Sequence, residues 1–255
     1  MGIGGAVVLL VLSLLFRRNF FALFSGSSQP SAGQVTSTAP VSQTPQEAQA
    51  VKFVSFVLDD AQSTWEKVLP AQTNEQYHHA KLVLFRGSID SGCGSARAAS
   101  GPFYCPVDEK VYIDLAFNDE LRDRFGAPGD FAQAYVIAHE IGHHVQKILG
   151  TEEKVHQLME RDPDNARHWS VKLELQADCY AGVWGHSTQQ RNILEPGDVE
   201  EGLNAAASVG DDHIQKMSGR AVSPESFTHG SARDRMAWFR RGFDSGQLSS
   251  CNTFQ

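Results

Sequence analysis

Apolar residues recur at helical spacing through most of the chain beyond residue 46. Over 47–69 they stand three and four positions apart, and Pro70 follows, so the pattern predicts a helix that stops there. Similar spacing predicts further helices over 117–125, 130–149, 165–189, 196–212 and 231–244. Two β-like runs, 81–85 and 111–115, flank a turn-prone stretch rich in glycine and serine. The pattern is typical of a helix-rich α+β domain with a small antiparallel sheet.

The N-terminal end has a different character. Residues 2–16 carry no charge, and Arg17 and Arg18 separate them from a second apolar cluster at 20–24. The first run is shorter than the about 20 residues of a membrane-crossing helix, and it lacks the basic start of a signal peptide. We interpret 1–24 as a membrane anchor or an uncleaved signal, with a buried core helix as the alternative.

Residues 25–45 contain no charged side chain and consist mainly of Ser, Gln, Thr, Pro, Ala and Gly. Such a composition buries too little apolar surface to offset chain entropy, so it predicts a flexible linker. The folded domain is then expected over 46–255. This organisation predicts a single-pass membrane protein whose domain is periplasmic or extracellular.

Composition narrows the class of protein. The chain has 22 Lys and Arg against 30 Asp and Glu, a net charge of -8, so it has no overall positive field to attract nucleic acid. A hydrophobic fraction of 41% excludes a disordered chain, and four cysteines are too few for a miniprotein built on disulfides. A folded, acidic domain that does not bind nucleic acid remains.

The helix predicted over 130–149 contains the sequence His-Glu-Ile-Gly-His at 139–143. Residues four apart lie on one face of a helix, so the imidazoles of His139 and His143 can bind one Zn²⁺ ion while Glu140 lies beside it as a base. The alternative is an amphipathic helix whose polar residues face water.

A catalytic zinc ion usually has three protein ligands and a water molecule. In the helix predicted over 165–189, Glu174 and Asp178 share a face, and apolar neighbours nearly all round predict that this helix is buried. Buried carboxylates need a partner. Glu174 is the predicted third ligand, and Asp178 the acceptor of a hydrogen bond from the outer ring nitrogen of a ligand histidine. Solvated acidic residues are the alternative.

His229 differs from the other histidines because it precedes a predicted helix within a Gly/Ser context. We expect it to donate to a developing oxyanion, and a structural role in the turn stays open. Leu149 and Gln146 stand where the metzincin pattern requires His and Gly, so that pattern is excluded. His144 points off the ligand face. The remaining six histidines, 78, 79, 156, 168, 186 and 213, are expected in solvent or in the core.

The cysteines favour an oxidising compartment. Cys93 and Cys105 can close a short loop, and Cys179 can join its helix to Cys251 near the C-terminus. A zinc site built from Cys and His is the competing interpretation, but the sequence has no Cys-x-x-Cys pair.

Several motifs together resemble the bacterial neutral zinc metallopeptidase family. They are the surroundings of Cys93 and Cys105, the segments 138–146 and 174–182, and the ending Phe-Thr-His-Gly-Ser at 227–231. The resemblance covers most of 46–255. It implies an exported, N-terminally anchored, zincin-like protein with His139 and His143 as ligands and Glu140 as base. Similarity to gluzincins more broadly implies the same roles for Glu174 and Asp178.

We therefore predict a membrane-anchored zinc endopeptidase that acts on proteins or peptides through a water activated by Glu140. Tyr135, Tyr180 and His229 are candidate oxyanion donors, with His229 preferred. The strand at 111–115 is expected to be a sheet edge to which an extended substrate adds. The alternatives are a zinc-stabilised binding domain without proteolysis and a degenerate peptidase acting as an adaptor, against which the intact Glu140 argues.

Overall fold

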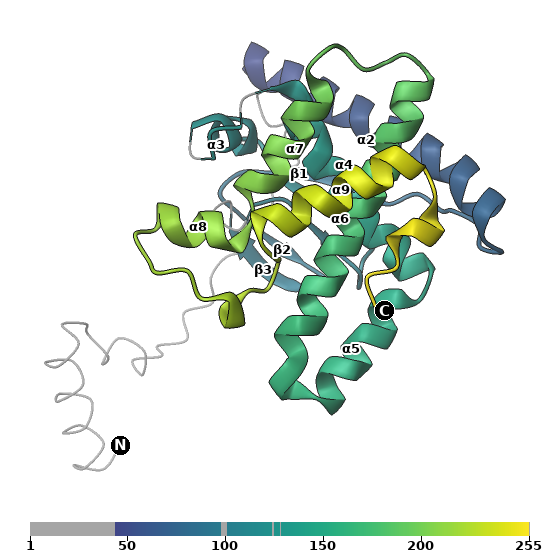
Figure 1. The fold of residues 1–255 in the computed structure, drawn as a ribbon. Helices are drawn as coiled ribbons and strands as arrows, with labels where there is room; N and C mark the ends of the chain where they lie inside the picture. The colour runs from purple at the N-terminus through teal and green to yellow at the C-terminus, as the bar shows by residue number, and fades with distance from the viewer. Residues whose placement is uncertain (1–43, 98–100, 124, 128, 255) are drawn as a thin grey trace, which may run out of the picture. The chain divides into compact units, whose positions relative to one another are not determined.

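The computed structural model describes residues 44–97, 101–123, 125–127 and 129–254 (Figure 1). The predicted anchor at 1–24 lies outside these residues, as does most of the predicted linker at 25–45. The last two linker positions, Thr44 and Pro45, belong to the start of a helix.

One prediction from the N-terminal segment is corrected. Over the described ranges, every helix falls short of the combined length and apolarity that a bilayer crossing demands. The predicted single-pass membrane localisation, with a periplasmic or extracellular domain, is therefore not supported.

Helices dominate the described chain, which confirms the predicted fold class. Their bounds are α2 Pro45–Gln72, α3 Phe117–Asp123, α4 Asp130–Ile148, α5 Thr151–Arg161, α6 Ala166–Gln190, α7 Asp198–Ser208, α8 Asp211–Met217 and α9 Ala232–Ser245, with short 3-10 turns η3 Pro163–Asn165, η4 Pro224–Ser226 and η5 Leu248–Cys251. The sequence pattern missed α5. The single helix predicted over 196–212 is two helices, because Gly210 is extended and packs so tightly against Ala232 that a Cβ atom would lie 2.3 Å from its backbone nitrogen.

Helix α2 begins where its sequence provides a cap. The Thr44 hydroxyl accepts a hydrogen bond from the Glu47 backbone N–H, the Glu47 carboxylate accepts one from the Thr44 N–H, and Pro45 occupies the first turn. Pro70 does not stop the helix as predicted, since it lies within the last turn and the helix continues to Gln72.

The main sheet has three strands in the order β1 (Lys81–Phe85), β5 (Lys110–Asp114) and β4 (Phe103–Cys105). The β1–β5 pair is parallel and the β4–β5 pair is antiparallel, so the sheet is mixed. A separate hairpin joins β2 (Ser88–Ser91) to β3 (Gly94–Arg97). The strand predicted as the substrate-binding edge, 111–115, corresponds to β5 and lies in the centre of the sheet, so that prediction is wrong.

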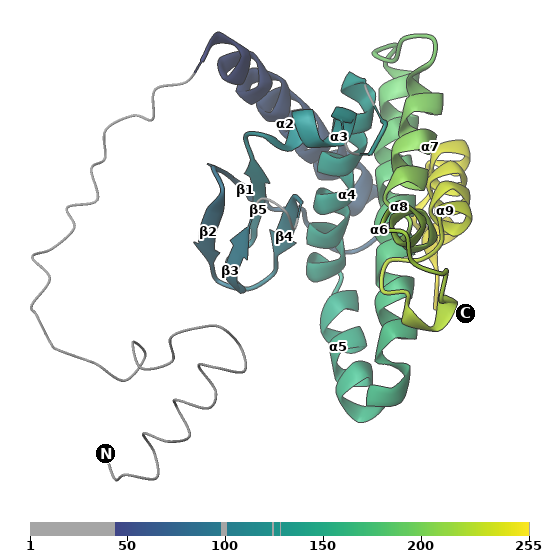
Figure 2. The same ribbon diagram turned by 90° about the vertical axis from the view of Figure 1, so that its left-hand side faces the viewer.

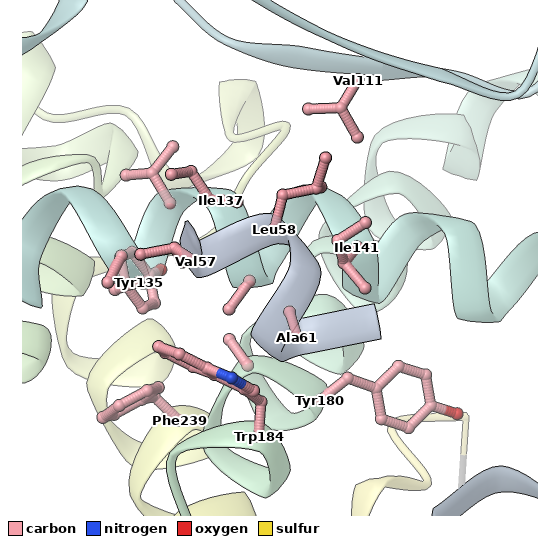
Figure 3. Packing of buried hydrophobic residues seen from close by; sticks show 14 of the residues in the cluster. Val57, Leu58, Ala61, Val111, Tyr135, Ile137, Ile141, Tyr180, Trp184 and Phe239 are labelled. Carbon is pink, nitrogen blue, oxygen red and sulfur yellow. The ribbon is translucent and has the colours of Figure 1, made fainter. Parts of the chain in front are cut away.

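The core lies between α2, α4, α6 and α9. Figure 3 shows Val57, Leu58 and Ala61 of α2 close to Ile137 and Ile141 of α4, and all five side chains are buried. In Figure 2 the sheet lies on one side of α4, with β4 nearest to it, while α6 and then α9 lie on the other side. Helix α4, the metal-motif helix, contains the sequence His-Glu-Ile-Gly-His and is thus held between strand β4 and helix α6.

Small residues allow the helices to approach closely. A Cβ atom on Gly142 of α4 would lie 2.9 Å from the carbonyl oxygen of Ala177 on α6, so these helices touch through their backbones beside the two histidines. On the other face of α6, a Cβ atom on Gly182 would lie 2.1 Å from the carbonyl oxygen of Phe239 on α9. Helix α6 is therefore fixed from both sides.

Both predicted disulfides are present. Cys93 bonds to Cys105 and joins the turn of the β2–β3 hairpin to strand β4. Cys179 bonds to Cys251 and joins α6 to the C-terminal turn η5. The competing zinc site built on cysteines is excluded for these four residues.

We predict that Gly182→Ala destabilises the protein by about 1–3 kcal/mol, because the new methyl group overlaps the α9 backbone. This loss should exceed the gain in helix propensity, which is at most about 1 kcal/mol. Urea unfolding of the metal-free protein measures the difference. Gln189→Ala, at an exposed position of the same helix, is the control, and a Gly182→Ala protein as stable as wild type would contradict the packing described.

Candidate metal centre

Three side chains predicted as ligands meet between α4 and α6. The Nε2 atoms of His139 and His143 lie 3.2 Å apart. The Glu174 carboxylate lies 3.2 Å from the first through Oε2 and 3.6 Å from the second through Oε1. The helices explain the convergence, since the histidines are one turn apart on α4 and the close contact at Gly142 brings α6 beside them.

The spacing of these atoms fits a zinc ion. Ligand atoms about 2.1 Å from a tetrahedral ion lie about 3.4 Å from one another, which matches the three separations. Two imidazole nitrogens and a carboxylate oxygen are also a donor set that zinc takes in catalytic sites. The charge of the site also suits a cation, because the Glu174 carboxylate is anionic. Burial alone would raise its pKa, but the two imidazoles hold the pKa well below its usual range.

His139 is fixed from behind by Asp178, one turn beyond Glu174. Its Nδ1 atom lies 2.8 Å from Asp178 Oδ1, and this carboxylate also accepts from the Tyr135 hydroxyl at 2.5 Å. Arg235 of α9 donates to both carboxylate oxygens, at 2.8 Å each. Asp178 is fully buried and Arg235 is 4% exposed, so each charge depends mainly on the other for stabilisation.

This network sets the protonation of the metal-free site. Burial disfavours the charged form of His139, but Asp178 and Glu174 outweigh it and raise its pKa to about 10. Burial also opposes the charge on Asp178, whereas Arg235 and His139 lower its pKa to about 2. Hence Nδ1 of His139 carries a proton toward Asp178, and Nε2 is the nitrogen directed to the other two ligands.

His143 is oriented by a different, uncharged chain of hydrogen bonds. Its Nδ1 atom lies 2.9 Å from the side-chain oxygen of Gln146, whose amide nitrogen donates to the Leu173 carbonyl and to Gln176 Oε1. Gln176 in turn donates to the carbonyl of Cys251. The backbone carbonyls at the end of this chain can only accept, so the amide nitrogens of Gln146 and Gln176 are the donors. The oxygen of Gln146 then accepts from Nδ1 of His143, and the Nε2 atom of His143 keeps its lone pair on the side of Glu174.

Glu140 is 7% exposed and lies beside His139, His143 and Glu174, which we call the triad. All four residues line one cleft. Burial raises its pKa to about 7, although the charge of His139 and a hydrogen bond from the Tyr104 backbone act in the opposite direction. A carboxyl group with this pKa can both accept and return a proton near neutral pH.

His229 lies in the wall of the cleft, on the loop before α9. Asp211 holds this loop, because one carboxylate oxygen accepts from the backbone N–H groups of Thr228, His229 and Gly230 at 2.7, 2.7 and 3.0 Å. The other oxygen lies 3.2 Å from His229 Nδ1, and this bond raises the pKa of His229 against the opposing effect of burial.

The two tyrosines considered as oxyanion donors have other roles. Tyr135 directs its hydroxyl to Asp178, behind the ligands. Tyr180 is buried in the core with its ring edge against Trp65, and it is not among the residues that line the cleft.

The cleft has a volume of about 780 Å³ and an uneven lining. One part of the lining is mainly apolar, and another comes from α5 and the start of α6, which lie together at one end of the long helices in Figure 2. The apolar part includes Phe117, Val136, Val209 and Ile214, and the end at α5 includes Glu152, His156, Met159, Ala166, Arg167, Ser170 and Leu173. Residues 101–104, which contain part of strand β4, form one wall. The triad therefore lies in a groove large enough for several residues of a peptide.

His144, predicted to point off the ligand face, is fully buried on the side of α4 that faces the sheet. Its two ring nitrogens lie 2.8 Å from the Tyr104 hydroxyl and 2.6 Å from the His78 carbonyl oxygen, so both are engaged. It packs the metal-motif helix against strand β4 and is not available as a ligand in this arrangement.

Sequence reasoning missed Arg235, Gln146 and Asp211. Gln146 had a usable signal, since it is a polar residue three positions from His143 on a helix predicted to be buried. Arg235 and Asp211 had none, because charged residues recur along both helices and their spacing does not mark these two.

A helix-rich domain with two histidines and a glutamate around one point, and a second glutamate beside them in a cleft, has the architecture of a zincin-type metal site. The family model described as "Putative neutral zinc metallopeptidase" matches residues 1–254, and the chain belongs to this family. A zinc site is thereby implied, and the triad is a group of side chains able to hold the ion.

Relatives extend over most of the chain. It is 48% identical over 256 residues to "Uncharacterized protein YpfJ" of Escherichia coli, which covers 99% of this chain and 87% of that protein. It is 42% identical over 203 residues to "Uncharacterized protein Mb2605" of Mycobacterium bovis, covering 75% and 66% respectively. No solved structure matches the chain.

We predict that Gln146→Met weakens zinc binding by about 10–100-fold, because His143 loses the acceptor that fixes its tautomer. Competition with a chromophoric chelator measures the affinity. Gln62→Met is the matched control, since Gln62 is equally buried but lies in α2 near Tyr77. Equal zinc affinities for the two variants would contradict the role given to Gln146.

We also predict that zinc binding to the metal-free protein tightens as pH rises from about 7 to 9 and releases at least one proton per ion. The raised pKa of about 10 means that His139 is protonated over this range, and the ion must displace that proton. His143, whose pKa is lowered by burial, adds no such proton. Calorimetry in buffers of different ionisation enthalpy counts the protons, and an affinity independent of pH would refute the assignment.

Proposed function

We propose that this protein is a zinc-dependent endopeptidase that hydrolyses peptide bonds of protein or peptide substrates. The observation that carries the proposal is the meeting of His139, His143 and Glu174 at zinc-ligand spacing, with Glu140 beside them in an open groove. When bound, zinc supplies a Lewis acid that makes a water molecule more acidic and polarises the substrate carbonyl.

Glu140 acts as the general base and then as the general acid. Its carboxylate takes a proton from the attacking water and returns it to the amine nitrogen as the peptide bond breaks. Burial raises the pKa of Glu140 in the metal-free site, which makes its carboxylate a stronger base for this proton.

His229 stabilises the negative charge that develops on the substrate oxygen. Asp211 accepts from Nδ1 and raises the pKa of His229, and in the protonated ring Nε2 also carries a proton that it can donate toward the cleft. The three backbone contacts of Asp211 hold the loop, which keeps this donor in place without movement during the reaction.

Strand β4 provides the support for the substrate backbone. It pairs with β5 on one side only among the described strands, it lies next to α4 (Figure 2), and Phe103 and Tyr104 line the cleft. An extended peptide can therefore add to this edge through main-chain hydrogen bonds and pass over the triad. The Tyr104–His144 contact fixes the distance from this edge to the metal-motif helix.

We predict that Glu140→Gln lowers the kcat for peptide cleavage by about 10²–10⁴-fold while zinc remains bound, because the base is lost but the three ligands are kept. Cleavage of casein and of a peptide library by zinc-loaded protein measures the effect, with zinc content determined on the same samples. Glu75→Gln, at an exposed position three residues beyond the end of α2, is the control for the change in charge.

Cleavage that persists in zinc-loaded Glu140→Gln would eliminate this mechanism. Wild-type protein that binds one zinc ion and cleaves none of these substrates would instead favour a zinc-stabilised binding domain. In that case the Gln146 variant would still change metal affinity, so the metal site and the peptidase activity are tested separately.

A further inference from the structure

The cleft contains a carboxylate that the proposed mechanism does not use. Glu152 lies in the first turn of α5, and its side chain is 14% exposed and lines the same cleft as His143. One oxygen, Oε1, lies 3.6 Å from Nε2 of His156. The other, Oε2, is buried and has no hydrogen-bond partner among the described residues.

Such an oxygen is costly to leave unpaired. A buried carboxylate oxygen that has given up water without gaining a donor is destabilising, and it becomes favourable once a cation or an N–H group reaches it. The described side chains around Glu152 do not meet this need. His143 is committed to the triad, Lys147 is exposed, and the His156 side chain is 60% exposed and faces only Oε1.

The surroundings match a long cationic side chain. Met159, Ala166 and Leu173 line the same end of the cleft, so the apolar stem of a lysine or arginine can lie against them while its charged end reaches Glu152. A carboxylate accepts hydrogen bonds only, so an ammonium or guanidinium group complements it and an acidic group is repelled. Arg167 and His156 also line this end, and both would favour an acidic ligand when they are charged.

We propose that Glu152 forms a subsite that binds a positively charged group of the peptide substrate, so that this end of the cleft selects basic residues. The proposal rests on the proposed peptidase function, because it assigns a substrate class to the same groove. The cation is either a lysine or arginine side chain or the α-amino group of the peptide.

The test separates binding from cleavage. Fluorescent peptides that carry Lys, Arg, norleucine or Glu at successive positions are titrated into zinc-loaded Glu140→Gln, and the same set is repeated with Glu140→Gln combined with Glu152→Gln. At one position the Lys and Arg peptides should bind about 10–100-fold more tightly than the norleucine peptide, and the second variant should lose this preference. Acetylation of the peptide N-terminus distinguishes an α-amino group from a side chain.

Cleavage by protein with an intact Glu140 gives the second measurement. Wild type should show the same preference in kcat/KM, Glu152→Gln should lose it, and Glu152→Lys should prefer the Glu peptide. Glu153→Gln, the exposed neighbour in the same turn, is the matched control and should keep the wild-type preference.

The measurements distinguish failure of the Glu152 subsite from failure of the peptidase function. Basic and norleucine peptides that bind equally well, or a basic preference that survives Glu152→Gln, would overturn the subsite. Cleavage that is efficient but indifferent to charge would leave the peptidase standing and remove the subsite. Charge-selective binding with no cleavage by wild type would support the subsite and remove the peptidase.

Discussion

The buried ion pair between Asp178 and Arg235 is the interaction on which the site depends. It joins α6 to α9, and through Tyr135 and His139 it joins both to α4. Neither charge is tolerable in the core without the other. A shift of α9 away from α6 would therefore leave both charges buried and unpaired. Once Asp178 is held against His139, Glu174 one turn away must lie beside the Nε2 atoms. The position of Glu174, the candidate third ligand, therefore depends on the ion pair between Asp178 and Arg235.

Much of this was predictable because helices impose fixed spacing. His139 and His143 had to share a face, as did Glu174 and Asp178, and the apolar pattern marked both helices as buried. The same reasoning gave the bounds of α4, α6 and α9 to within one or two residues. The two disulfides were also predicted, because Cys93 and Cys105 are close enough in sequence to close a short loop, which leaves Cys179 to pair with Cys251.

What the sequence missed depends on contacts between distant elements. Alternating residues identified β5 as a strand, but nothing local determines its neighbours, and it proved to be central while the short β4 forms the edge. Arg235 is one of four arginines in α9, and only the approach of α6 through Gly182 and Gly242 selects it for burial. Asp211 depends on the break at Gly210, which a helical pattern running across 196–212 concealed.

The charges of the groove show why Glu152 is unlike the other acids. With a divalent ion bound, Glu174 and Glu140 together balance its two positive charges, and Asp178 is balanced by Arg235. The two glutamines that orient His143 add no charge. Glu152 is not part of this balance, and its buried oxygen without a hydrogen-bond partner among the described residues distinguishes it from the other acids that line the groove. Electrostatic complementarity therefore favours a substrate that brings a positive charge to this end.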